Sequence, residues 1–296
     1  MFSICIPVYN YNVCQLVNDL HRQAIKCGQP FEILLMDDAS QDEYRRKNSA
    51  IKLPYLRYIQ LTENAGRSKI RNRLCDAAQY PYLIFIDCDS AVYSADYIAN
   101  YIPFFKPDIV CYGGCIYNDK MPDEKKYLRW KYGKKRESLP VWQREKEPNF
   151  SFKSGNFLIY KNLLKKNPFN EDLSEYGHED TFLGIQLLGE GIFIQQIDNP
   201  LIHLGLEDSE IFIAKTEKAL VNLKIIDGIL QKKYPEYVKH SRLVRIERNL
   251  KKLRLNSLVA FIVNVFKPII KKNLLGKHPS ILLFDVYKLG IYSSKK

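Results

Sequence analysis

Three nearly uninterrupted apolar runs early in the chain limit what it can fold into. They are Phe2–Val8, Phe31–Met36 and Tyr82–Ile86, and a shorter strand is expected over Leu56–Leu61. Two of the segments between them carry apolar residues at the spacing of one helix face: Val13, Leu16, Val17, Leu20, Ala24 and Ile25 in the first, and Ile70, Leu74, Ala77 and Ala78 before the third run. Buried strands alternating with amphipathic helices are typical of a parallel sheet covered by helices on both faces. The sequence therefore predicts an α/β fold.

Acidic pairs stand where two of these strands end. Asp37 and Asp38 close the second run, and Asp87 and Asp89 follow the third. In parallel sheets, ligands bind outside the carboxyl ends of the strands. A hard divalent cation prefers oxygen ligands, and a nucleoside diphosphate supplies more of them, so this edge is a candidate metal and nucleotide site. The simpler alternatives are solvated loop acids, turns or helix caps.

A loop with two arginines is a second candidate for nucleotide contact. In the segment Asn64–Arg67, Gly66 allows close approach of the backbone, and Arg71 lies one helical turn after Arg67. Guanidinium groups suit phosphate geometry, and a helix N-terminus favours the same anion. A solvated basic helix face is the competing interpretation.

Carboxylates also stand at the start of a later helix. Glu179 and Asp180 precede the apolar helix pattern that ends at Gly189. A carboxylate there can act as a general base, or it can be favourable only through the helix dipole. His203, which follows the next strands, is a candidate third metal ligand, although a single histidine is more often structural.

The order of these segments resembles a known family. The segments are SICIPVYN, MDDAS, NAGRSKIRN, FIDCDS, SGN and GHEDTFLGIQLLGEG. Together they resemble a family 2 glycosyltransferase of the GT-A fold over about Ser3 to Gly205. The last segment resembles the galactosyltransferase-like variant with a Gly-x-Glu-Asp motif. The resemblance implies a Rossmann-like α/β domain with a mixed, mostly parallel sheet and helices on both faces.

The resemblance also implies roles for individual residues. Pro7, Val8 and Tyr9 would line the nucleoside pocket, Asp38 would contact the base, and Asp87 the ribose or metal. The implied sugar-donor-binding residues are Pro7, Val8, Tyr9, Asp38, Arg67, Arg71, Asp87, Gly155 and Asn156. Asp89, Asp87 and His203 would hold Mn²⁺ or Mg²⁺. Asp180 would be the general base, with Glu179 beside it orienting the acceptor.

The implied function is inverting transfer of a sugar from a nucleoside-diphosphate sugar, with uridine as the expected base. The acceptor would be a hydroxyl of a glycan or lipid-linked saccharide, in surface polysaccharide biosynthesis. A catalytically inactive nucleotide- or membrane-binding scaffold of the same fold is the alternative, and the acids at positions 38, 87, 89 and 180 argue against it. A nucleotidyltransferase would need a glycine-rich loop after the first strand, where the chain has Pro7–Asn12. A receiver-like signalling domain would carry its acid pair after the first strand, whereas here the pair follows the second.

The net charge of +12 is concentrated at the C-terminal end. Residues 216–296 contain 18 Lys or Arg and 5 Asp or Glu, which leaves 27 and 28 for the rest of the chain. We expect a catalytic domain over residues 1–210 and a helical, basic extension over residues 211–296. The extension mixes basic with apolar residues, which fits docking on an anionic membrane surface. It also fits packing on the catalytic domain with a solvated basic face.

Other features point to a cytoplasmic protein, peripheral at the inner face of the cell membrane if the extension docks there. The N-terminus enters a strand at once, without the pattern of a secretory signal. No run reaches the roughly 20 apolar residues of a membrane span. The seven cysteines are scattered and predict reduced thiols. A nucleic-acid partner is not expected, since the charge lies in the extension and no recognition motif is evident.

Overall fold

In the computed structural model the chain forms two compact units, and the structure describes residues 1–173, 177–234 and 240–294. The sheet unit comprises Met1–Tyr117, Ser138–Asp172 and Glu179–Gly205. The helical unit comprises Asn118–Glu137, Leu173–His178 and Leu206–Lys296. The domain division predicted at residue 210 stays a prediction.

A seven-stranded sheet forms the centre of the sheet unit, in the order β3-β2-β1-β4-β8-β6-β9. Its strands are β1 (Phe2–Val8), β2 (Phe31–Asp37), β3 (Leu56–Gln60), β4 (Tyr82–Ile86), β6 (Val110–Tyr112), β8 (Asn156–Tyr160) and β9 (Gln195–Gln196). Four neighbouring pairs are parallel, and β8 runs antiparallel to both β4 and β6. The prediction of a mixed, mostly parallel sheet is therefore confirmed.

A second, three-stranded sheet lies in the same unit, in the order β5-β10-β7. Its strands are β5 (Ser90–Val92), β7 (Cys115–Ile116) and β10 (Leu201–His203). Because β5 and β10 are antiparallel and place His203 opposite Ser90, this small sheet brings the end of β10 back to the residues that follow β4.

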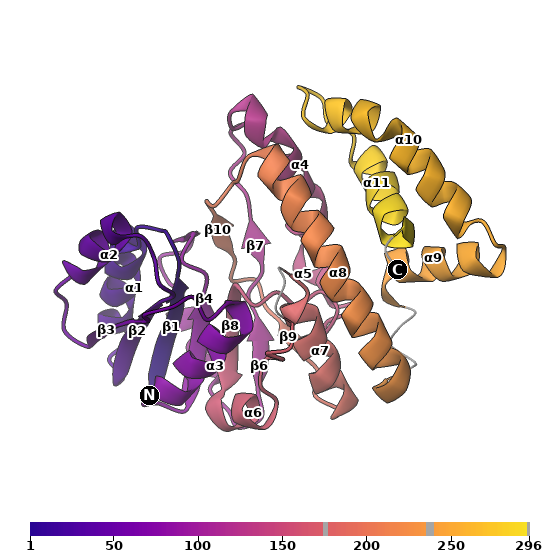
Figure 1. The fold of residues 1–296 in the computed structure, drawn as a ribbon. Coiled ribbons are helices and arrows are strands. Elements are labelled where there is room, and N and C mark those ends of the chain that lie inside the picture. The colour runs from indigo at the N-terminus through magenta and orange to yellow at the C-terminus, as the bar shows by residue number, and fades with distance from the viewer. Residues whose placement is uncertain (174–176, 235–239, 295–296) are drawn as a thin grey trace. The chain divides into compact units, whose positions relative to one another are not determined.

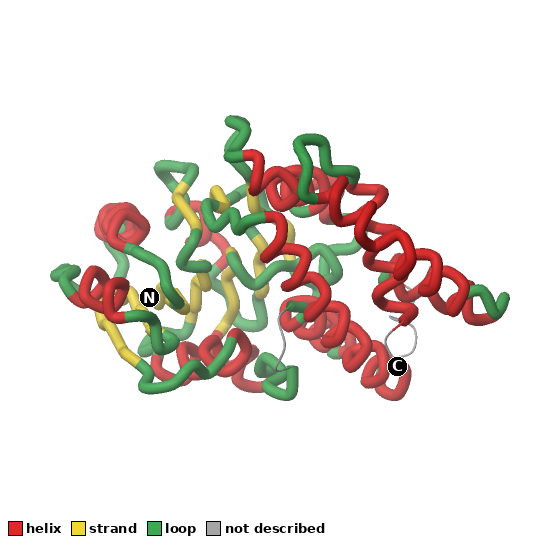
Figure 2. Tube along the Cα trace, turned by 45° about the horizontal axis from the view of Figure 1, so that its top comes forward, coloured by secondary structure: helices red, strands yellow, loops and turns green. Residues whose placement is uncertain are grey.

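Helices cover both faces of the large sheet. They are α1 (Cys14–Lys26), α2 (Asp42–Ser49), α3 (Arg67–Ala77), α5 (Val141–Arg144), α6 (Lys161–Lys166), α7 (Glu179–Gly189) and the 3-10 helix Ala99–Phe104. Alternate residues of β1 point into different cores: Ile4 packs with Leu20 of α1, and Cys5 packs with Leu74 of α3. Figures 1 and 2 show the strands of this unit bordered by these helices.

The helical unit is built around long helices. They are α4 (Tyr127–Arg136), α8 (Ser209–Lys233), α9 (Arg242–Lys252), α10 (Asn256–Leu274) and α11 (Ile281–Ser294), with a 3-10 turn at Glu124–Lys126. Its core joins Leu128 of α4, Phe212 of α8, Val263 of α10 and Phe284 of α11. α10 and α11 lie side by side in both views. The helical character expected after residue 210 is thus present in the described residues.

None of the helices in the described residues is by itself long and apolar enough to cross a membrane. α9 and α10 meet that criterion only when taken together, and they bend by 115° where they join.

Candidate functional site

The carboxyl ends of the central strands form one edge on which predicted site residues gather. Val8 at the end of β1 lies opposite Asp37 at the end of β2 in the parallel register. The backbone N–H of Asp38 donates to the carbonyl of Val8 over 2.8 Å, and that of Asp87 donates to the carbonyl of Gly155 over 3.0 Å. Backbone hydrogen bonds therefore join the end of β1 to the end of β2, and the end of β4 to the residue before β8.

The end of β1 presents the residues predicted to line a nucleoside pocket. Val8 is completely buried in the core, and its carbonyl already accepts from Asp38. Pro7 is partly exposed, and the ring of Tyr9 is exposed and can stack on a base. The geometry is compatible with the predicted role, which stays a prediction.

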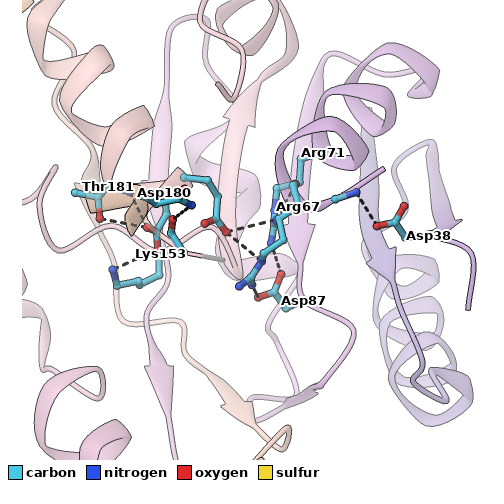
Figure 3. Close-up of polar contacts among 11 residues, drawn as sticks. Asp38, Arg67, Arg71, Asp87, Lys153, Asp180 and Thr181 are labelled. Atoms are coloured by element: carbon cyan, nitrogen blue, oxygen red, sulfur yellow. Dashed lines mark hydrogen bonds and ion pairs between the residues drawn. The ribbon is translucent and has the colours of Figure 1, made fainter. Parts of the chain in front are cut away.

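Asp38 is engaged by the loop before α3. Its carboxylate accepts hydrogen bonds from the backbone N–H groups of Ala65, at 2.6 Å, and Gly66, at 3.1 Å. Asn64 donates to the Asp38 carbonyl over 3.1 Å. Gly66 has a φ of +83°, a conformation that favours glycine. Asp38, labelled in Figure 3, therefore positions the loop that carries Arg67, and its predicted contact with the base stays a prediction.

A buried ion pair joins α3 to the end of β4. Arg71 is only 2% exposed, and its Nη2 lies 2.6 Å from Oδ1 of Asp87. Burial raises the pKa of Asp87, but the positive charges of Arg71 and Arg67 outweigh burial and hold the pKa below its ordinary value. Gly155 packs against this carboxylate, since a Cβ there would lie 2.7 Å from Oδ2 of Asp87. Asp87 is thus fixed as an anion by its neighbours.

Arg67 connects this pair to the start of α7. Its Nε lies 3.1 Å from Oε1 of Glu179, and its Nη2 lies 3.7 Å from Oδ2 of Asp87. Glu179 is buried, and Arg71 adds a longer contact of 3.9 Å. Figure 3 shows Arg67 and Arg71 beside Asp87. Glu179 therefore belongs to a two-arginine, two-carboxylate cluster, an arrangement that the sequence did not predict; its predicted role in orienting an acceptor stays a prediction.

Asp180 points to a different partner from Glu179. Its Oδ2 lies 3.2 Å from Nζ of Lys153, as Figure 3 shows. Its Oδ1 accepts from the backbone N–H of Thr181 at 2.6 Å and from the hydroxyl of Thr181 at 3.2 Å. The first turn of α7 also favours negative charge. Both effects favour the ionised carboxylate, which is the form that a general base requires.

The side-chain amide of Asn156 makes all of its hydrogen bonds within the protein. Its Oδ1 accepts from the hydroxyls of Tyr97, at 2.6 Å, and Tyr101, at 2.8 Å. Its Nδ2 donates to the carbonyls of Gly114, at 2.8 Å, and Asn199, at 2.9 Å. An amide makes no more than about four hydrogen bonds. The predicted place of Asn156 beside a donor sugar stays a prediction, while its side chain in this structure ties β8 to three loops.

Asp89, the second acid after β4, lies beside His203. The backbone N–H of Leu204 donates to the Asp89 carbonyl over 2.8 Å, and His203 Nδ1 lies 3.6 Å from Asp89 Oδ1. The ring of Tyr117 meets the His203 ring edge-on at 5.3 Å. Gly205 packs so closely that a Cβ there would lie 2.0 Å from Asp89 Oδ2. Strand pairing thus brings together two residues far apart in the sequence.

The predicted metal ligands are brought together only in part. Among the residues that the structure describes, no three His, Cys, Asp or Glu side chains are grouped to hold a metal ion. The carboxylate of Asp87 is already ion-paired with Arg71 and Arg67. Asp89 offers a carboxylate oxygen, which suits Mn²⁺ or Mg²⁺, and His203 offers a nitrogen, so a diphosphate would have to supply the remaining oxygens. Burial and then Asp89 raise the pKa of Cys88 to about 12, so this neighbouring thiol offers no thiolate.

Sequence reasoning missed two features of this site. The sequence suggested no role for Lys153, yet it is the ion-pair partner of Asp180. Its position directly before the Ser154-Gly155 pair was the available signal. The arginine partners of Glu179 lie more than one hundred residues away in the chain, and no local pattern indicated them.

Comparison with known proteins places this geometry in a family. The family described as "Glycosyl transferase family 2" matches residues 3–169, more than half of the chain. No curated protein matches the sequence. The match ends before residue 177, so the galactosyltransferase-like segment remains a prediction.

A solved structure of similar fold agrees with this family match. A mannosyltransferase, PcManGT from Pyrobaculum calidifontis in complex with GDP-Man and Mn²⁺, superimposes with a TM-score of 0.52 at 15% identity. The comparison covers 75% of this chain and 62% of that one, so this chain spans less than two thirds of its length. S. aureus TarS 1–349 gives a TM-score of 0.48 at 19% identity, covering 99% of this chain and 88% of that one. The family match and the mostly parallel sheet together show that this chain belongs to glycosyl transferase family 2 and has a GT-A fold.

Proposed function

We propose that this protein transfers a sugar, with inversion, from a nucleoside-diphosphate sugar, expected to be a UDP-sugar, to an acceptor hydroxyl. The observation that carries the proposal is the position of Arg67, which contacts both Asp87 and Glu179. Arg67 thereby links the Asp87-Cys88-Asp89 segment to the start of α7, where Asp180 stands. Arg67 therefore connects the candidate metal-binding segment to Glu179, the chain neighbour of the candidate base, within the sheet unit.

Different residues of this chain have different roles in the proposed reaction. In a single displacement, the acceptor hydroxyl attacks the anomeric carbon from the face opposite the diphosphate, and Asp180 accepts its proton. Lys153 keeps Asp180 ionised before the proton arrives. Arg67 is half exposed and can reach a phosphate, while Arg71 is buried and holds Asp87 in place.

Asp89 and His203 would hold a divalent cation, Mn²⁺ or Mg²⁺, which stabilises the negative charge of a departing diphosphate. The mannosyltransferase of similar fold is in complex with GDP-Man and Mn²⁺, which supports a nucleotide-sugar donor and a divalent metal here.

The acceptor in this proposal is a glycan or lipid-linked saccharide at the inner face of the cell membrane, in surface polysaccharide biosynthesis. The basic composition of residues 216–296 supports a membrane location. The alternative, an inactive nucleotide- or membrane-binding scaffold of the same fold, predicts the same family match without turnover.

The donor site can be tested by thermal unfolding with UDP, GDP and dTDP, each with and without Mn²⁺. A ligand at 100 times its dissociation constant adds about 2.7 kcal/mol, which should raise the unfolding midpoint by roughly 5–10 °C. We expect one nucleotide to give this shift only with metal. The shift should disappear in Asp89→Asn and persist in Asp119→Asn, an exposed aspartate of the helical unit. If no nucleotide shifts the midpoint, the scaffold interpretation becomes the better one.

A further inference from the structure

One face of α10 is apolar and exposed along its length. The residues of this face, which we name the α10 stripe, recur every three or four positions and are Leu258, Phe261, Ile262, Val265, Phe266 and Ile269. Phe261 and Ile269 are 65% and 66% exposed. Surface helices of globular proteins normally turn polar residues outward, and a contiguous apolar face of this kind marks an interaction site.

The other face of α10 is already occupied within the helical unit. Val263, Ile270 and Leu274 are buried in the core that includes Phe284 of α11. Val263 packs so tightly against Gly290 of α11 that a Cβ at that glycine would lie 2.3 Å from it. α10 is therefore held by one side, and the α10 stripe on its other side is exposed.

Basic residues lie at both ends of the α10 stripe. Residues 248–284 contain eight Lys or Arg and no Asp or Glu. Lys251, Lys252 and Arg254 lie just before α10, and Lys272 and Lys277 lie at or after its last turn. Lys251 pairs with Glu247 of its own helix, and Lys277 pairs with Glu124. Lys252, Arg254 and Lys272 are exposed to solvent.

The geometry points to an anionic lipid leaflet as the surface that covers the α10 stripe. A leaflet offers an apolar layer for the stripe and negative headgroups for the basic residues at each end. A second copy of the chain fits poorly, because parallel and antiparallel pairing of two stripes would both bring basic ends together. This inference deepens the proposed function, which places the acceptor at a membrane, and it identifies the docking face.

Vesicle flotation of the full chain tests the inference. The probes are phosphatidylcholine vesicles with and without about one third phosphatidylglycerol, at low salt and at 0.5 M salt. We expect the protein to float with the anionic vesicles at low salt, and to bind far less when salt is raised or phosphatidylglycerol is omitted. The doubly substituted Phe261→Glu, Ile269→Glu protein should bind at least about tenfold more weakly, since two apolar side chains no longer enter the lipid.

Two further variants distinguish the contribution of the α10 stripe to vesicle binding from that of the basic residues. Phe193→Glu replaces an equally exposed phenylalanine of the sheet unit, 69% exposed, and should bind vesicles like the wild type. The triple change Lys252→Gln, Arg254→Gln, Lys272→Gln should weaken anionic binding by roughly 100-fold, at about fivefold per charge. Circular dichroism melting should show that all variants remain folded, as expected for exposed positions.

Three outcomes would overturn the inference: no flotation of the wild type with anionic vesicles at low salt, wild-type flotation of the doubly substituted protein, or a dimer in sedimentation that the double change abolishes. The last would identify a second copy as the occupant. None of these outcomes alters the nucleotide-dependent thermal shift, so failure here is distinguishable from failure of the proposed function.

Discussion

Lys153 Nζ lies 3.2 Å from Asp180 Oδ2, so the candidate base of this protein is held in an ion pair. A positive charge at this distance favours the ionised carboxylate, which is the form that can accept a proton. The pairing explains why a lysine directly precedes the Ser154-Gly155 turn, and it makes the base sensitive to one substitution outside α7.

Lys153→Gln should therefore shift the acidic limb of the pH–rate profile to higher pH. Without the ammonium group, Asp180 takes up a proton more readily, so activity is lost at a higher pH as the pH falls. The effect should be modest, because the Lys153 side chain is partly exposed and solvent screens its charge. Lys52→Gln, at an exposed position, serves as the control and should leave the profile unchanged. An unshifted profile in Lys153→Gln would show that the pair does not act on the base.

Substitutions of Arg71 and Arg67 should affect different properties, folding stability for Arg71 and nucleotide binding for Arg67. Arg71→Met leaves Asp87 without its buried partner, and breaking such a pair costs about 3 kcal/mol or more. Arg67→Gln removes a side chain that is 41% exposed, and should cost less than about 1 kcal/mol while weakening nucleotide binding. Urea unfolding measures the first effect and nucleotide titration the second. Equal losses of stability in the two variants would contradict this division.

Gly205→Ala should disturb Asp89 without unfolding the protein. A Cβ at this position would lie 2.0 Å from Oδ2 of Asp89, so the carboxylate must turn away from His203. We expect Mn²⁺ affinity, measured by calorimetry, to fall by about tenfold or more, the range seen when metal-site supports are lost. Gly228→Ala in α8 is the matched control, since a Cβ there meets no atom within 4 Å. Unchanged metal affinity in Gly205→Ala would remove Asp89 from the ligand set.

Asn156→Asp should destabilise the protein in a pH-dependent way. One oxygen of the new carboxylate would face the carbonyls of Gly114 and Asn199, which now accept from Nδ2. Repulsion and burial raise the folded-state pKa of that carboxyl above its unfolded value. The penalty, about 3 kcal/mol, is therefore full at neutral pH and shrinks as the pH falls through the raised folded pKa. Urea unfolding at pH 7 and pH 5 checks this, and a variant that is as stable as the wild type at pH 7 would refute the structural role.

The strands and the positions of the acids could be predicted from sequence because both are local signals. β1, β2 and β4 are buried on both faces, so their composition alone marks them. The helix α2 was not predicted, since only Asn48 of its eight residues is buried and it carries no apolar stripe. Asn48 instead fixes the helix by donating to the Tyr11 carbonyl and accepting from the Val13 N–H.

The side-chain partners within the site could not be predicted, because they depend on distant segments. Glu179 meets Arg67, and Asn156 meets Tyr97 and Tyr101, only after the sheet has formed. A motif identifies which residues carry chemistry in a family. It does not show which of them are already saturated by their own protein, as the Asn156 amide is.

The most direct test of sugar transfer by this site compares the wild type with Asp180→Asn. The measurement is release of nucleoside diphosphate from the sugar donor selected by the thermal shift, in the presence of Mn²⁺ and a membrane-lipid or glycan acceptor extract. The account predicts unchanged nucleotide binding and turnover lower by roughly 100- to 10,000-fold, the usual contribution of a positioned general base. Undiminished turnover in Asp180→Asn would contradict the account and remove Asp180 from the role of base.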